Sequence, residues 1–164
     1  MLAAVYEGEG RLELKERPIP TIHHEKDVLI KVNAVGICGT DLHILQTPPM
    51  HPATRGIILG HEFSGTIIEL GQKVKGFDIG ENVIVDPHPG CGICRQCKMG
   101  QPDRCENLYS EKTPGQPQTI GIFSDGAMTS YIIIPEHSLY KIDQKVPPYI
   151  AALAEPLSCV VNAT

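Results

Sequence analysis

Four of the six cysteines fall within one short stretch, CGICRQCKMGQPDRC, which contains Cys91, Cys94, Cys97 and Cys105. Two intervening residues let a tight turn direct two sulfurs at one ion, and the longer spacing before Cys105 lets a fourth thiolate complete a tetrahedron. The spacing therefore predicts a four-thiolate zinc site. An iron–sulfur cluster is the main alternative, but the fourth cysteine lies too far along the chain and no proline follows it. Unligated thiols are the remaining alternative.

A zinc ion held by four thiolates has no open coordination position, so we expect this site to be structural and not catalytic. The segment around it has few apolar residues with which to form a core. Structural zinc contributes apparent binding free energy on the order of 10 kcal/mol in small peptides, and that energy is available to folding. We therefore expect the ion to stabilise a lobe of about residues 88–110.

The length and charge of the chain exclude several classes of function. With 164 residues, 41% hydrophobic and 20% charged, the chain is long enough for one domain with its own core. The formal net charge is −5 and neither Lys nor Arg clusters, which argues against a nucleic-acid or membrane partner. No apolar run approaches the length of a membrane span, and the N-terminus lacks the features of a secretion signal. We therefore expect a cytoplasmic protein whose cysteines are reduced or metal-bound.

Short β-like segments separated by Gly and Pro make up most of the chain. DVLIKVNAV alternates between two sets of side chains, and GTIIELG, NVIVD, MTSYIIIP and SLYKI are similar β-prone runs. This pattern predicts a mainly β fold, either a barrel or a sandwich. Two helical pieces interrupt it, one near GTDLHILQ and one in PPYIAALAEPLSCVVNAT. In the second, Pro147 and Pro148 suit a helix start, Pro156 marks a break or kink, and Cys159 is expected to be a packed thiol.

Four dispersed residues stand where a polar side chain or a thiol needs an explanation. His61 and Glu62 lie together between glycines in GIILGHEFSG, directly after three apolar residues. Cys38 follows a predicted strand in VGICGTDLH, and Glu155 is an acid in an otherwise apolar helix. Taken singly, Cys38 and His61 fit a buried thiol and a hydrogen-bonded core histidine. A thiol and an imidazole that follow two separate strands can also meet at one rim of a barrel, and a buried carboxylate needs a partner or a metal.

Together these motifs resemble the zinc-containing alcohol dehydrogenases of the medium-chain dehydrogenase/reductase family. GHEFSGTIIELGQKV has the family's spacing G-H-E-x2-G-x5-G-x2-V, and CGTDLH, the four-cysteine stretch and AEPLS all fall in the expected order. The resemblance covers essentially the whole chain and is nearest to the polyol, sorbitol, butanediol and threonine dehydrogenases. It implies a GroES-like, partly open β-barrel over residues 1–164 with a zinc-binding lobe and short helices. It also implies two zinc ions per chain, one catalytic and one structural.

Carried over residue by residue, the resemblance places Cys38 and His61 among the ligands of the catalytic zinc. Glu62 and Glu155 compete for the remaining protein position. In polyol- and threonine-dehydrogenase-like relatives the glutamate next to the histidine is commonly a ligand. The acid of the EPL segment replaces a cysteine ligand of the alcohol-dehydrogenase branch, where it binds the metal directly or through water. The sequence does not decide between the two glutamates.

The resemblance also implies a route for a proton. Zinc in an open site acidifies an alcohol before hydride passes to a nicotinamide. We assign the proton relay to Thr40 and His43, which lie three residues apart on one face of the short helix. The alternative is that Thr40 caps the helix and His43 is merely exposed. Asp41 is expected to be a first-turn acid favoured by the helix dipole, without a catalytic role.

The sequence contains no dinucleotide-binding fingerprint, because GEGRLE at Gly8 and Gly10 lacks the third glycine of G-x-G-x-x-G. In the family that the chain resembles, the Rossmann domain starts just after the last predicted helix. We therefore expect the front half of a longer, homo-oligomeric parent, a dimer or tetramer. The parent would oxidise a secondary alcohol or polyol to a ketone with NAD or NADP, and the isolated chain would be inactive. The alternative is a stand-alone zinc-binding or interaction module.

Overall fold

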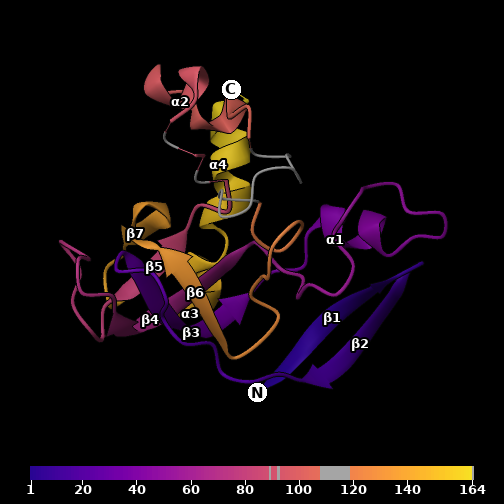
Figure 1. Ribbon diagram of the computed structural model, residues 1–164, viewed down its shortest axis with the longest axis horizontal. Coiled ribbons are helices and arrows are strands. Elements are labelled where there is room, and N and C mark those ends of the chain that lie inside the picture. Colours follow the sequence, from indigo (N-terminus) through magenta and orange to yellow (C-terminus); the bar gives the residue numbers. More distant parts are fainter. Residues whose placement is uncertain (89, 92, 108–118, 164) are drawn as a thin grey trace.

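The computed structural model describes residues 1–88, 90–91, 93–107 and 119–163, and the protein is mainly β (Figure 1). The larger sheet has five antiparallel strands in the order β6-β3-β4-β5-β7. Because β6 and β7 form its edges, the sheet is open, which agrees with the predicted partly open architecture. The strand bounds are β3 Asp27–Val35, β4 Phe63–Leu70, β5 Asn82–Val85, β6 Tyr131–Pro135 and β7 Leu139–Lys141.

A two-stranded hairpin of β1 (Leu2–Gly8) and β2 (Arg11–Glu16) lies against two loop segments. Ala4 N donates to Met128 O at 2.9 Å, and Tyr6 N donates to Ile57 O at 2.8 Å. In return, Leu59 N donates to Ala4 O at 3.2 Å. The free edge of β1 therefore holds the apolar segment that leads directly to His61.

The main core is formed by alternate apolar side chains of the five-stranded sheet. Ile30 of β3 lies opposite Ile67 of β4 and Ile132 of β6, and it is fully buried. Burying a side chain of this size stabilises the fold by roughly 1.5–3 kcal/mol. The β3–β4 register shifts between Val32 and Ala34, and this irregularity precedes the end of β3. Such irregularities re-aim side chains next to functional sites.

The helices are short and lie outside the sheet. α1 spans Gly39–Ile44, and α3 (Pro148–Ala151) begins at Pro148, as predicted. α4 (Ala154–Asn162) follows a break at residues 152–153. Pro156 has no amide hydrogen and its ring meets the carbonyl four residues earlier, so the break lies where this proline requires it. No helix among the described residues is long and apolar enough to cross a membrane.

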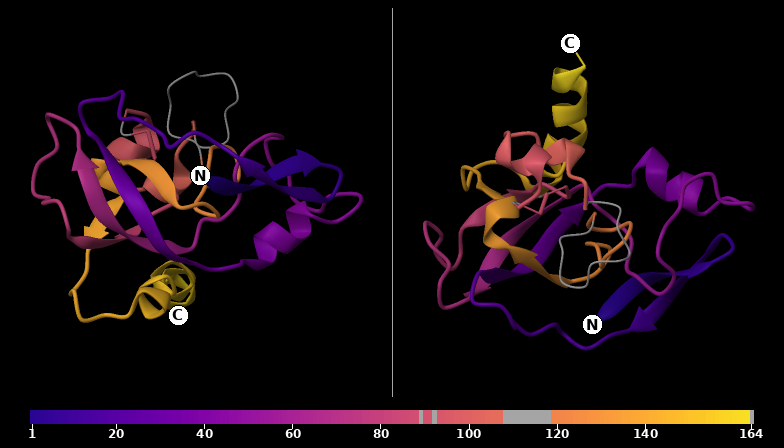
Figure 2. Two further views of the ribbon diagram at one scale, coloured as in Figure 1. Left: turned by 90° about the horizontal axis from the view of Figure 1, so that it is seen from below. Right: turned by 45° about the horizontal axis from the view of Figure 1, so that its top comes forward.

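α4 projects from the sheet on the same side as the cysteine lobe (Figures 1 and 2). The prediction that Cys159 is a packed thiol is wrong, because Cys159 is exposed. Leu157 and Val160 on the same helix are also exposed, by 60% and 61%. Sequence periodicity indicates an apolar helix face, but it does not say whether this domain covers that face.

The cysteine lobe contains two short helical turns, α2 (Arg95–Lys98) and the 3-10 turn η1 (Pro102–Arg104). A second 3-10 turn, η2 (Glu136–Ser138), connects β6 to β7. α2 has no buried residue, so the lobe has little apolar packing of its own. Of the predicted lobe of residues 88–110, residues 89, 92 and 108–110 lie outside the described residues.

Candidate metal centres

The sulfurs of the four lobe cysteines all lie within 4.8 Å of one another, in the group Cys91, Cys94, Cys97 and Cys105. Backbone amides point at these sulfurs. Cys94 N donates to Cys91 Sγ and Cys97 N donates to Cys94 Sγ, both at 3.4 Å. Hydrogen bonds of this kind favour the charged thiolate. The local turns thus arrange donors around a point that lies between the sulfurs.

The thiols of this cluster differ in pKa. Burial raises the pKa of Cys91, but hydrogen bonds from Ile93, Asn107 and Cys94 outweigh it and bring the value to about 6. Burial raises the pKa of Cys105 to about 11. Four thiolates in contact repel one another unless a cation neutralises them. The donor set therefore fits a structural zinc ion and leaves no position open for a substrate.

A second group consists of Cys38, His61 and Glu62, whose ligand atoms also lie within 4.8 Å of one another. Cys38 follows β3, and His61 and Glu62 lead into β4. Since Val35 lies opposite Phe63 in the β3–β4 ladder, the end of one strand and the start of the other are side by side. We call these three residues the trio. Its histidine and glutamate are only 4% and 8% exposed.

The electrostatics of the trio fit a cation. Burial raises the pKa of the Cys38 thiol, hydrogen bonds from Thr40 lower it, and the neighbouring Glu62 carboxylate raises it. Two acidic groups this close repel each other once both are ionised, and a cation between them removes that repulsion. One thiol, one imidazole and one carboxylate fit a zinc site that keeps a position open for a further ligand.

Asp41 lies against His61, a contact that the sequence analysis did not predict. Asp41 is almost fully buried, and its Oδ2 accepts a hydrogen bond from Cys38 N at 2.9 Å. Its other oxygen, Oδ1, lies 3.8 Å from His61 Nδ1. Burial raises the pKa of Asp41, whereas hydrogen bonding to Cys38 N lowers it. The spacing C-x-x-D could have indicated the contact with Cys38 N, because an acid three residues after a helix cap returns to the cap, but it carries no signal for the contact with His61.

The other predicted site residues lie around the trio at different distances. Glu155 is half-buried in the first turn of α4 and does not belong to the trio. Burial raises its pKa, and it interacts electrostatically with His61 and Glu62. Thr40 lies beside the Cys38 thiol, whereas His43 is exposed on α1. The structure thus brings a carboxylate oxygen of Glu62, and not of Glu155, within 4.8 Å of both the thiol and the imidazole.

A family profile described as "Alcohol dehydrogenase GroES-like domain" matches residues 24–144. The chain belongs to this family. The matched residues include the trio, the four-cysteine cluster, Thr40 and His43. The predictions of family and of a mainly β, GroES-like fold are therefore confirmed.

Two curated relatives are similar over most of this GroES-like domain. The protein named "Probable D-xylulose reductase A" from Arthroderma otae is 33% identical over 165 residues, which cover 99% of this chain and 44% of the relative. L-threonine 3-dehydrogenase from Proteus mirabilis is 34% identical over 147 residues, which cover 88% of this chain and 40% of the relative. The chain thus spans less than half the length of these relatives.

A solved structure is similar over almost the whole GroES-like domain. It is a Sinorhizobium meliloti 1021 protein assigned as a zinc-binding dehydrogenase and solved with NADP bound. The two chains superpose with a TM-score of 0.85 at 34% identity, over 98% of this chain and 43% of the other. The cofactor of that protein belongs to a molecule more than twice as long.

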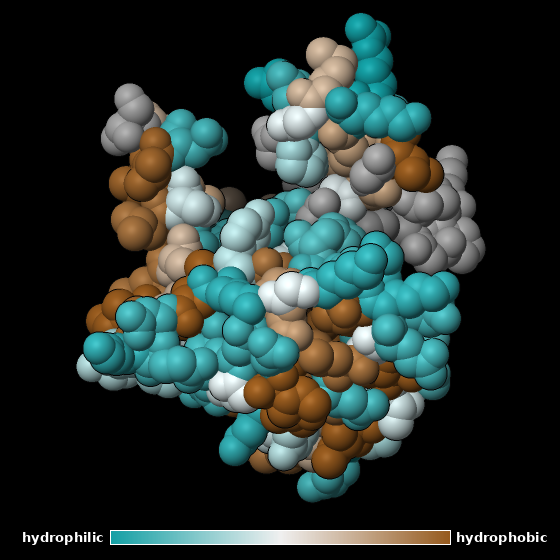
Figure 3. Space-filling model, turned by 90° about the vertical axis from the view of Figure 1, so that its left-hand side faces the viewer, coloured by the Kyte–Doolittle hydropathy of each residue, from teal (hydrophilic) through white to brown (hydrophobic). Residues whose placement is uncertain are grey.

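A cleft of about 550 Å³ separates α4 from the cysteine lobe of the GroES-like domain (Figure 3). Glu155 and Cys159 line it from α4, Pro102 lines it from the lobe, and His88 lies between them. Its volume is in the range of small-molecule sites. Burial lowers the pKa of His88, whereas the neighbouring Asp86 raises it. The sequence analysis did not assign His88 to any site. Its place in this cleft depends on how the cysteine lobe is arranged relative to α4.

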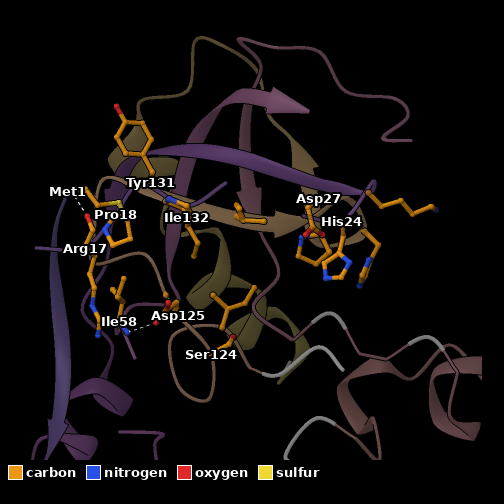
Figure 4. A pocket seen from close by; sticks show the side chains of 17 residues that line it. Met1, Arg17, Pro18, His24, Asp27, Ile58, Ser124, Asp125, Tyr131 and Ile132 are labelled. Atoms are coloured by element: carbon orange, nitrogen blue, oxygen red, sulfur yellow. Dashed lines mark hydrogen bonds between the residues drawn. The ribbon is translucent and has the colours of Figure 1, made fainter. Parts of the chain in front are cut away.

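A larger hollow of about 780 Å³ lies between the N-terminal segment, the loop around residues 120–126 and β6 (Figure 4). None of the predicted site residues lines it. Arg17 Nη2 at its wall donates to Gly56 O at 2.9 Å, and Asp125 Oδ1 accepts from Ile58 N at 2.9 Å. Both side chains thus hold neighbouring backbone in place.

Proposed function

We propose that this chain is the catalytic domain of a zinc-dependent dehydrogenase that oxidises a secondary alcohol or polyol to a ketone with NAD or NADP. The juxtaposition of Cys38, His61 and Glu62 at one rim of the sheet carries the proposal. The names of the relatives and the NADP-bound neighbour support the reaction class. The dinucleotide would be held by a separate domain of a longer parent, since this chain spans 40–44% of those relatives.

The trio would hold the catalytic zinc, with Glu155 as the second carboxylate in reach. Because His61 Nδ1 faces Asp41, Nε2 is the ring nitrogen left to act as a ligand. Bound there, zinc supplies Lewis acidity that lowers the pKa of an alcohol hydroxyl. The thiolate and the carboxylate carry one negative charge each and the imidazole is neutral. The three ligands together would therefore balance the charge of a dication.

Thr40 and His43 would carry the proton that the alcohol loses. The hydroxyl of Thr40 lies next to the Cys38 thiol, so it can accept the proton at Oγ1 while passing its own onward. His43 is exposed on α1 and can take a proton at a ring nitrogen and release it to water. Asp41 would keep the proton of His61 on Nδ1 and the ring in its orientation once a small shift closes the 3.8 Å between Oδ1 and Nδ1.

The structural zinc would be held by the four lobe cysteines, Cys91, Cys94, Cys97 and Cys105. That ion would fix the lobe that forms one wall of the cleft beside Glu155. A small alcohol or polyol is the substrate class that the family indicates. We place the protein in the cytoplasm and expect a homo-oligomeric parent, without a nucleic-acid or membrane partner.

Zinc analysis of purified variants tests the proposed site. The wild-type chain should contain close to two zinc ions, and Cys38→Ser should contain one. Cys159→Ser is the matched control, because this cysteine is exposed on α4, and it should retain both ions. A wild-type chain with a single zinc ion that Cys38→Ser does not change would contradict the proposal. The substrate and the choice between NAD and NADP are then measured with a panel of alcohols and polyols on the longer parent.

A further inference from the structure

Gly36 lies between the end of β3 and Cys38, with its α-carbon against the side chain of Glu62. A Cβ added at Gly36 would overlap Glu62 Oε2 and would lie 3.1 Å from Glu62 Cβ. The two backbone segments are held together here, because Gly36 N donates to Glu62 O at 2.7 Å. The space where a side chain of residue 36 would project is therefore occupied by the carboxylate of the trio.

Backbone conformation does not explain the glycine at this position. Several glycines of the chain adopt positive φ values, but Gly36 is not one of them. An alanine is therefore compatible with the backbone here. What a Cβ would displace is mainly the far end of one flexible side chain, which can rotate to another rotamer without unfolding the sheet.

We propose that Gly36 is a positioning residue for Glu62. The missing side chain keeps open the space in which the carboxylate lies within 4.8 Å of the Cys38 sulfur and the His61 ring. Glu155 does not belong to the trio, so Gly36 would favour Glu62 as the protein carboxylate of the site. This inference rests on the proposed function, because it assumes that the trio binds a metal ion.

Cobalt titration of the full chain tests the inference without any measurement of activity. One equivalent of zinc is added first to fill the four-thiolate cluster, which soft thiolate ligands favour for zinc. Co²⁺ is then titrated while its visible absorption, which reports the ligand set, is recorded. Gly36→Ala should weaken Co²⁺ binding about tenfold and change the spectrum, as expected for a ligand that loses its support. Gly39→Ala is the matched control, because a Cβ there meets nothing within 4 Å.

The same substitution in the Glu62→Ala variant distinguishes an effect on the position of Glu62 from a general effect on the fold. In Glu62→Ala the carboxylate is gone, so adding Gly36→Ala should cause no further loss of affinity. An equal tenfold loss in this background would overturn the inference, as would wild-type Co²⁺ binding by Gly36→Ala alone. If the wild-type chain binds no second metal ion, the proposed function is contradicted and this inference with it. Circular dichroism of each variant establishes that it is folded.

Discussion

Asp41 Oδ1 lies 3.8 Å from His61 Nδ1, and neither atom has a hydrogen-bond partner within the described part of the chain. Leaving a buried polar atom without a partner costs about 1–3 kcal/mol. A small shift of the imidazole toward the carboxylate would satisfy both atoms at once. The geometry is that of a histidine held ready by an acid behind it, a common arrangement for metal-binding histidines.

The first prediction concerns this acid. Asp41→Asn keeps the size of the side chain but removes its charge, so it should weaken zinc binding at the trio by about 10–100-fold. The four-cysteine cluster should be unaffected. Competition with a chromophoric chelator measures both sites. Asp78→Asn is the control, because Asp78 is an exposed loop acid, and an equal loss in this variant would argue against a specific role.

The second prediction concerns the structural zinc. Cys97→Ser should remove one zinc ion per chain and lower the thermal unfolding midpoint, because α2 has no buried side chain to hold the lobe without the metal. Metal analysis and thermal unfolding of the same preparation measure the two effects. Retention of two zinc ions and of the wild-type midpoint would contradict the structural role. The exposed Cys159→Ser is again the matched control.

The third prediction concerns the core of the five-stranded sheet. Ile30→Ala should destabilise the domain by about 2–5 kcal/mol, because it leaves a cavity where β3, β4 and β6 meet. Ile79 is 66% exposed, so Ile79→Ala should change stability by less than about 0.5 kcal/mol. Urea unfolding of both variants provides the comparison. Similar stabilities would mean that the sheet does not form the core described here.

The fourth prediction concerns catalysis. The chain alone, loaded with zinc, should show no turnover of alcohols with NAD or NADP, because its sequence has no glycine fingerprint to position a nicotinamide. The absorbance of the reduced nicotinamide measures this directly. Turnover by the chain alone would refute the assignment of cofactor binding to another domain.

The spacing of the four lobe cysteines predicts their cluster because ligand spacing is a local property, whereas the grouping of Cys38 and His61 with Glu62 or Glu155 was implied by the resemblance to a family. Cys91 to Cys105 lie on one short segment, whereas Cys38 follows the end of β3 and His61 precedes the start of β4, not the end of a strand as expected. The contacts behind the ligands were not predictable in this way. Gly36 meets Glu62, and Asp41 meets His61, across segments far apart in the sequence that the pairing of β3 with β4 brings side by side.

The exposure of Cys159 was mispredicted for a related physical reason. A helix with many apolar residues is usually buried, but its burial depends on the surface that packs against it as well as on the helix itself. α4 leaves the sheet after its first turn, so Glu155 near the sheet is half-buried while Cys159, one turn on, is exposed. A single sequence contains no information on where that departure occurs.

The pairing of Val35 with Phe63 is the last of the β3–β4 ladder, and the trio lies just beyond it. A metal ion bound by the trio would hold the two strands together at the end of the ladder, where strand pairs open most easily. Fraying would separate the thiol from the imidazole and the carboxylate in one movement, and the ion would be lost. If the trio binds a metal ion as proposed, metal occupancy and closure of this strand pair should therefore rise and fall together.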